Sequence, residues 1–186
     1  FIDISILVRP PVIQCPPNQV LTVGVPISTL IKPTITGGAI TSVTYSALPS
    51  GLTVNPFDGT LTGTPTTQGN YTITLTANNS TGSSSCTFNV TVNPAAPTIS
   101  YPPSTSRNFT VNQNIQDWIP TITGTPLTNI SITPSLPAGL SLNTPGTRDG
   151  KIYGTPTGPV SQSTPYVVTV SNATGTASTT INISVT

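Results

Sequence analysis

The feature that most constrains the fold of this chain is an internal repeat. The stretch LPSGLTVNPFDGTLTGTPT at 48–66 is matched by LPAGLSLNTPGTRDGKIYGTPT at 136–157. The stretch ANNSTGSSSCTFNVTV at 77–92 is matched by SNATGTASTTINISV at 171–185. The first pair begins 88 residues apart and the second ends 93 residues apart, a drift that short loop insertions explain. The sequence therefore predicts two copies of one domain.

A short joint containing two prolines, NPAAP at 93–97, separates the two copies. Proline restricts its own backbone and that of the residue before it, so we expect this joint to be stiff. Domain 1 is predicted to span 9–93 and domain 2 to span 94–186. Residues 1–8 then lie outside both copies.

Each copy is predicted to consist of short β-strands. In NYTITLTAN, the side chains of Tyr71, Ile73 and Leu75 alternate with threonines, which is the period of a strand with one buried face. The 21 prolines and 15 glycines supply turns between such strands, and no stretch has the apolar spacing of a helix. The predicted fold is all-β, with two tandem β-sandwiches.

The first residues repeat the last strand of each copy. In FIDISILV, Ile2, Ile4 and Ile6 alternate with polar residues, and the segment aligns without gaps on FNVTV at 88–92. This extra strand has three interpretations. It belongs to a preceding repeat of a longer array, it pairs with a sheet edge of a neighbouring molecule, or it folds onto domain 1. In the second case, Ile2, Ile4 and Ile6 form an intersubunit strand that links copies head to tail.

Three motifs occur in both copies: L-P-x-G-L, G-x-(I/L)-x-G-T-P, and N-x-x-G before the last strand. With these marks the chain resembles the putative-immunoglobulin, cadherin-like repeat found in tandem on bacterial and archaeal surface and secreted proteins. The resemblance covers nearly the whole chain apart from 1–8. It implies immunoglobulin-like or cadherin-like sandwiches in an extracellular setting, where such repeats serve as spacers, adhesin stalks and accessory modules.

The two cysteines, Cys15 and Cys86, both lie in domain 1, near its first and last strands. We expect a disulfide between them, which would close a span of 71 residues and indicate an oxidising environment. The alternative is a pair of buried thiols. Domain 2 has Tyr101 and Thr179 at the matching positions, so it must fold without a bridge.

Asparagine sequons are frequent, although the abundance of Asn, Ser and Thr makes several matches expected by chance. Asn89 and Asn182 alternate with apolar residues on the closing strands, so they are expected to point outward where a glycan fits. A glycan coat would also keep a chain with 5 % charged residues soluble. The candidate N-glycosylation sites are Asn70, Asn78, Asn79, Asn89, Asn108, Asn129, Asn172 and Asn182.

Little in the sequence indicates catalysis, so no enzyme activity and no cofactor are predicted. The chain has no histidine and four carboxylates, Asp3, Asp58, Asp117 and Asp149, which are far apart in sequence. No metal site is expected, and the joint at 93–97 has no acidic residues for calcium. The net charge of +1 gives no reason to expect nucleic acid, and no apolar run is long enough to span a membrane.

Trp118 is the single tryptophan. It is expected to be a core or interdomain anchor, with a sugar-stacking platform as the alternative.

These features predict a structural subunit or repeat segment of an extracellular filament, stalk or surface layer. Its partners would be copies of itself or neighbouring repeats, with glycans as additional partners. The alternative is an adhesin or carbohydrate-binding module of a larger secreted protein. A third interpretation is an accessory domain pair of a secreted enzyme whose catalytic part lies elsewhere.

Overall fold

The computed structural model describes residues 8–143 and 149–186, and the chain divides between Asn93 and Pro94 into two compact units. Unit 1 precedes this point and unit 2 follows it. Every regular element in the described ranges is a β-strand, so the all-β prediction is confirmed. The expected extra strand at 1–8 lies outside the described residues, except for Val8.

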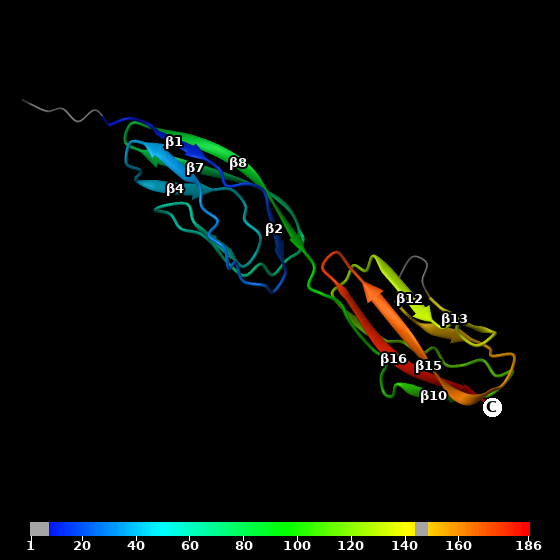
Figure 1. Ribbon diagram of the computed structural model, residues 1–186. Helices are drawn as coiled ribbons and strands as arrows, with labels where there is room; N and C mark the ends of the chain where they lie inside the picture. The colour runs from blue at the N-terminus through cyan, green and yellow to red at the C-terminus, as the bar shows by residue number, and fades with distance from the viewer. Residues whose placement is uncertain (1–7, 144–148) are drawn as a thin grey trace, which may run out of the picture. The chain divides into compact units, whose positions relative to one another are not determined.

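Among the described residues, each unit contains eight strands, several of which are labelled in Figure 1. Unit 1 contains β1 (Pro11–Gln14), β2 (Gln19–Thr22), β3 (Thr34–Gly37), β4 (Ser42–Tyr45), β5 (Leu52–Val54), β6 (Leu61–Gly63), β7 (Gly69–Asn79) and β8 (Gly82–Asn93). Unit 2 contains β9 (Thr98–Ser100), β10 (Ser106–Phe109), β11 (Thr121–Thr123), β12 (Asn129–Thr133), β13 (Leu140–Leu142), β14 (Ile152–Gly154), β15 (Val160–Ser171) and β16 (Thr176–Val185).

The pairing of the strands is also the same in the two units. One layer of unit 1 is a four-stranded sheet in the order β2-β8-β7-β4, in which β2 runs parallel to β8. The other layer contains the pairs β1-β3 and β5-β6, joined by a bridge between Ile31 and Leu61. Unit 2 has the sheet β10-β16-β15-β12 and the pairs β9-β11 and β13-β14, joined by a bridge between Trp118 and Ile152. The repeated motifs therefore encode a repeated topology.

The long antiparallel hairpin β7-β8 supplies much of the core of unit 1. Its inward side chains are fully or almost fully buried, while the side chains between them are polar and face outward. Burying one such aliphatic or aromatic side chain contributes about 1.5–3 kcal/mol, so this face is the main source of stability. The buried members are Ile73, Leu75, Ala77, Phe88, Val90 and Val92.

Cys15 and Cys86 are joined by a disulfide in unit 1. Cys15 follows β1 in one layer and Cys86 lies in β8 of the other, so the bridge ties the two layers together. Both residues pack against the hydrophobic core.

Unit 2 has an aromatic cluster where unit 1 has the disulfide. The ring of Tyr101 meets Trp118 edge-on at 5.0 Å between centroids, and Phe109 lies 6.4 Å from the same ring. The Tyr101 hydroxyl donates a hydrogen bond to the carbonyl oxygen of Gly150, and burial raises the pKa of this phenol well above its ordinary value. Trp118 is 0 % exposed, with the Arg107 guanidinium 5.0 Å from its ring centroid. Trp118 is therefore a core residue, which rules out the sugar-stacking alternative.

The disulfide should stabilise unit 1 without affecting unit 2. In the chain-entropy model, a bridge that closes 71 residues contributes roughly 4 kcal/mol. Replacing both cysteines by alanine should lower the free energy of unfolding of unit 1 by an amount of that order. Two-transition calorimetry, with the unit assigned by tryptophan fluorescence from Trp118, measures the effect. An equal shift of the tryptophan-reported transition would contradict this assignment.

Candidate functional site

The carboxylates of the described residues serve local structure. Asp58 accepts hydrogen bonds from Thr60 in a turn and forms an ion pair with Lys32 at 3.1 Å. The hydrogen bonds from the backbone and side chain of Thr60 contribute most to lowering the pKa of Asp58; burial opposes them, and the contact with Lys32 lowers this pKa further. Asp117 forms an ion pair with Lys151 at 3.0 Å, and this contact raises the pKa of Lys151.

Metal ligation finds no support in the described part of the chain. Across 8–143 and 149–186, no group of three or more His, Cys, Asp or Glu side chains is close enough to hold an ion. Asp149 accepts hydrogen bonds from the Asn143 side chain at 2.9 Å and from the Lys151 backbone at 3.1 Å. Its carboxylate is thus engaged in hydrogen bonds to neighbouring residues before β14.

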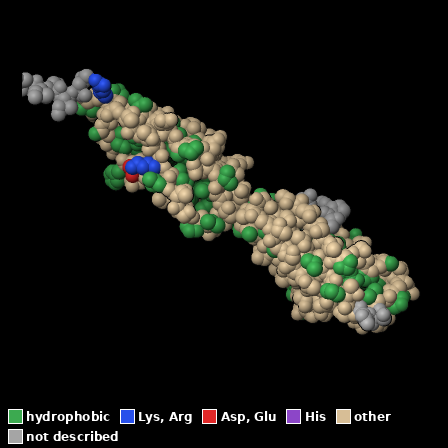
Figure 2. Space-filling view, in the orientation of Figure 1, with side chains coloured by type: hydrophobic (Ala, Val, Ile, Leu, Met, Phe, Trp, Pro, Cys, Tyr) green, Lys and Arg blue, Asp and Glu red, His purple; other side chains and the backbone are tan. Residues whose placement is uncertain are grey.

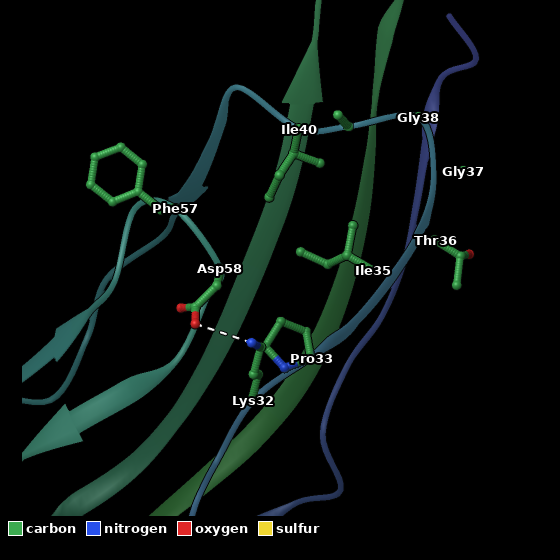
Figure 3. Close-up of a pocket in the computed structure, with 10 residues that line it drawn as sticks. Lys32, Pro33, Ile35, Thr36, Gly37, Gly38, Ile40, Phe57 and Asp58 are labelled. Carbon is green, nitrogen blue, oxygen red and sulfur yellow. Dashed lines mark hydrogen bonds and ion pairs between the residues drawn. The ribbon is translucent and has the colours of Figure 1, made fainter.

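A hollow of about 330 Å³ lies in unit 1 between β3 and the β5-β6 connection (Figure 3). Ile35 and Ile40 line one side, and the Lys32–Asp58 ion pair closes the lower rim. Phe57, at the opposite rim, is 76 % exposed. The hollow also borders an edge of β3, which pairs only with β1 among the described strands. The apolar part of its lining, with Ile35 and Ile40, and the adjacent strand edge suit an apolar side chain or an extended peptide.

A second hollow, of about 410 Å³, lies on the outer face of the four-stranded sheet of unit 1, and we call it the amide trough. It forms where β2, β8 and β7 run side by side, and none of its lining residues is charged. Two of the predicted sequon asparagines lie in it. The lining residues are Asn18, Gln19, Val20, Asn70, Tyr71, Thr72, Asn89, Val90 and Thr91.

The eight sequon asparagines differ in exposure. Asn70, Asn89, Asn108 and Asn129 are exposed, and Asn78, Asn79 and Asn182 are half-buried. Asn89 lies between the buried side chains of Phe88 and Val90 and points outward, as the alternation indicates. Asn172 differs from the rest because it is only 8 % exposed.

Asn172 forms hydrogen bonds with three parts of unit 2: its first residues, the residue that follows β11, and the turn between β15 and β16. Its amide nitrogen donates to the carbonyl oxygens of Ala95 and Gly124, both at 2.6 Å. Its side-chain oxygen accepts from the backbone N–H groups of Thr174 at 2.8 Å and Gly175 at 3.0 Å. We call this arrangement the asparagine clasp.

Gly124 permits the clasp because its φ is +71° and a Cβ there would lie 2.6 Å from the Ala95 oxygen. Both amide hydrogens of Asn172 are used in the clasp. A glycan on the Asn172 nitrogen would replace one of these two donors.

Unit 1 has the same clasp at Asn79. The Asn79 amide donates to the carbonyl oxygen of Arg9 at 2.7 Å, and its side-chain oxygen accepts from the N–H groups of Thr81 at 2.9 Å and Gly82 at 3.1 Å. Arg9 and Ala95 occupy matching positions at the start of their units. The N-x-x-G mark in the sequence is thus a structural motif that fixes the segment entering each unit.

The predicted intersubunit strand, Ile2, Ile4 and Ile6, lies outside the described residues. Among the described residues, no helix is long and apolar enough to cross a membrane.

A family model described as "Putative Ig domain" matches residues 9–93 and again 94–186. The chain belongs to this family. The family resemblance inferred from the motifs is therefore confirmed. No curated protein sequence matches the chain significantly.

Solved structures with tandem immunoglobulin domains are similar to the chain in fold. A titin I67–I69 variant is 20 % identical, with 95 % of this chain and 66 % of the titin chain covered and a TM-score of 0.52. Titin A168–A169 is 16 % identical, with 94 % and 98 % covered and a TM-score of 0.57. Sidekick-1 immunoglobulin domains 1–4 are 17 % identical, with 95 % and 48 % covered and a TM-score of 0.61. The chain thus spans just under two thirds of the first titin segment and about half of the Sidekick-1 segment.

Removing the clasp should destabilise unit 2 specifically. The Asn172→Ala variant leaves two carbonyls and two N–H groups without their partner, at a cost of about 1–3 kcal/mol for a buried unsatisfied group. Denaturant unfolding followed by Trp118 fluorescence measures the loss. Asn182→Ala is the matched control, since Asn182 makes one long side-chain contact, to Ser106 at 3.4 Å. Equal stability of the two variants would contradict the role of the clasp.

Proposed function

We propose that this tandem of immunoglobulin-like modules is a structural repeat segment of an extracellular filament, stalk or surface layer. In this proposal, the segment 2–8 links the chain to a further sandwich, in a preceding repeat or in a neighbouring molecule. The observation that carries the proposal is that each unit already has its own last strand, β8 in unit 1 and β16 in unit 2, in the middle of its four-stranded sheet.

Each unit already contains its own closing strand. β8 lies between β2 and β7, and β16 lies between β10 and β15. The inward side chains of these strands, such as Val90 and Ile183, are 0 % exposed. The segment 2–8 repeats the apolar alternation of β8, so its isoleucines call for an equivalent buried position. Since β8 and β16 fill that position in their units, the segment is expected to pair with a different sandwich.

The apolar hollow beside β3 supports pairing between copies as one form of this link. An edge of β3 borders this hollow, and Ile35 and Ile40 offer apolar surface beside it. An added strand gains main-chain hydrogen bonds along such an edge, while alternate side chains fill the adjacent hollow. Ile2, Ile4 and Ile6 have the required period.

A load-bearing role is supported by the way each unit holds its entering segment. The asparagine clasps at Asn79 and Asn172 bind the backbone just before the first strands. Pro94 and Pro97 restrict the joint, and the Thr174 hydroxyl donates to the carbonyl oxygen of Pro94. These contacts anchor the chain at the point where tension along an array would enter unit 2.

An extracellular location is supported by the disulfide, which persists in oxidising surroundings. The surface is nearly free of charge, and Figure 2 shows basic or acidic side chains at only two small places on the visible face. The exposed hydroxyl and amide groups of the sheets take the place of charge in keeping this surface hydrated.

Substitution of the isoleucines in the segment 2–8 tests whether this segment links the chain to a further sandwich. The triple variant Ile2→Asp, Ile4→Asp, Ile6→Asp removes the apolar alternation, and Ser5→Asp is the control at an outward position. Light scattering and electron microscopy of concentrated protein should show assemblies for the wild type and the control, and monomers for the triple variant. Both unfolding transitions should stay within about 0.5 kcal/mol of wild type, as for surface substitutions.

A monomeric wild-type chain would contradict exchange between copies. A loss of several kcal/mol from unit 1 in the triple variant would show that the segment belongs to the core of unit 1. In that case the linking role would fail altogether.

Glycosylation can be tested by comparing the exposed sequon asparagines with the buried one. In a host that modifies N-x-S/T sites, glycopeptide mass spectrometry of the folded protein should find glycan on exposed sequons, namely Asn70, Asn89, Asn108 and Asn129, and none on Asn172. The reason is that the Asn172 amide is buried and both its hydrogens are bonded. A folded chain carrying glycan on Asn172 would contradict the clasp.

A further inference from the structure

The amide trough has an unusual chemical composition for a protein surface. Four of its nine lining residues have side-chain amides, three have hydroxyl groups, and none carries a charge. Val20, which is 71 % exposed, provides an apolar patch beside these groups. The sheet beneath is rigid, because β2, β8 and β7 are neighbours in one hydrogen-bonded layer.

Internal hydrogen bonds orient three of the amides. The side-chain oxygen of Asn18 accepts from the backbone N–H of Asn89 at 2.9 Å. The oxygen of Asn70 accepts from the Thr91 hydroxyl at 2.9 Å, and the oxygen of Asn89 accepts from the Thr72 hydroxyl at 3.0 Å. Each oxygen is thus occupied, while the three amide nitrogens donate no hydrogen bond within the described part of the chain.

The strand register brings these donors together. In the β7-β8 pair, Asn70 lies opposite Thr91 and Thr72 lies opposite Asn89. The two asparagines are therefore diagonal neighbours on one face, about 7–8 Å apart. Asn18 is attached to the same point through its bond to the Asn89 backbone. Three asparagines whose side-chain oxygens are already bonded consequently line one hollow.

Such a set of donors matches a ligand with several acceptor oxygens and no formal charge. A neutral oligosaccharide presents hydroxyl and ring oxygens at short intervals, and its C–H faces pack on apolar side chains such as Val20. An anionic ligand fits less well, because the lining contains no Lys or Arg to compensate the loss of its hydration. We propose that the amide trough of unit 1 is a binding site for neutral oligosaccharides.

Unit 2 differs at the corresponding place and so provides an internal control. The backbone N–H of Asn182, which matches Asn89, donates to the carbonyl oxygen of Thr105 and not to a side-chain amide. On β10, Asn108 takes the register position that Val20 has on β2, so a polar side chain stands where unit 1 has its exposed apolar patch. Asn108 in unit 2 is exposed, and its side-chain oxygen accepts a hydrogen bond from the Ser184 hydroxyl at 3.1 Å. Asn108 therefore resembles Asn70 in its bonding, but it does not line the trough, which lies in unit 1.

The experiment is a nuclear magnetic resonance titration of the full, disulfide-bonded chain made in a host without N-glycosylation. The probes are mannohexaose, cellohexaose and chitohexaose, with hexagalacturonate as the anionic comparison. At least one neutral probe should shift the backbone amide resonances of β2, β7 and β8 at millimolar concentration. Raising sodium chloride from about 50 to about 500 mM should leave that affinity almost unchanged, since no ionic contact is involved.

Variants locate the site. Asn70→Ala and Asn89→Ala should each weaken binding about fivefold to tenfold, the effect of one neutral hydrogen bond. Val20→Arg should block the trough without removing any side-chain hydrogen bond, which keeps the test valid if an asparagine variant folds poorly. Asn108→Ala should bind as well as wild type. A chain carrying glycan on Asn70 or Asn89 should not bind the free probe, because the attached sugar fills the trough.

The proposal fails if no neutral probe shifts the resonances of β2, β7 and β8, or if Val20→Arg binds as tightly as wild type. It also fails if hexagalacturonate binds more tightly than every neutral probe, with an affinity that falls with salt. None of these outcomes bears on the assembly of the chain through residues 2–8, which is tested separately.

Discussion

The structure depends on the burial of one face of a long antiparallel hairpin in each unit. β7-β8 and β15-β16 are the longest strands, and their inward side chains make up a large share of each core. The shorter strands complete two layers around this face. Because alternation fixes the inward face, it also fixes the outward one, so the same hairpin that stabilises unit 1 presents the amides and hydroxyls of the trough.

The two units show that one topology tolerates different means of joining its layers. Unit 1 connects β1 and β8 covalently through Cys15 and Cys86, whereas unit 2 fills the space with Tyr101, Phe109 and Trp118. The bridge restricts the unfolded chain, while the aromatic residues add buried area and edge-to-face contacts. Ile31 pairs with Leu61 in unit 1, and Trp118 pairs with Ile152 in unit 2, so the strand pairing is the same although one unit has a disulfide and the other has aromatic residues.

Asparagine has three roles on this scaffold, which its sequence context alone does not distinguish. In the clasps, the side chains of Asn79 and Asn172 form hydrogen bonds with the backbone of a turn and with the backbone of the segment that enters the unit. On the outer sheet face of unit 1, Asn70 and Asn89 receive hydroxyl hydrogen bonds and leave their nitrogens available. Exposed sequons such as Asn129 remain accessible to modification. Burial and bonding separate these roles.

The sequence by itself determined the all-β class, the tandem repeat, the family and the outward direction of Asn89, because period-2 alternation and repeated turn motifs are local properties of a chain. Only the tertiary structure decided that Trp118 is a core residue, that Asn172 is buried, and that Asn18, Asn70 and Asn89 meet in one trough. These facts depend on which strands become neighbours and in which register. Residues 71 positions apart, such as Asn18 and Asn89, meet through non-local pairing that no short window of sequence encodes.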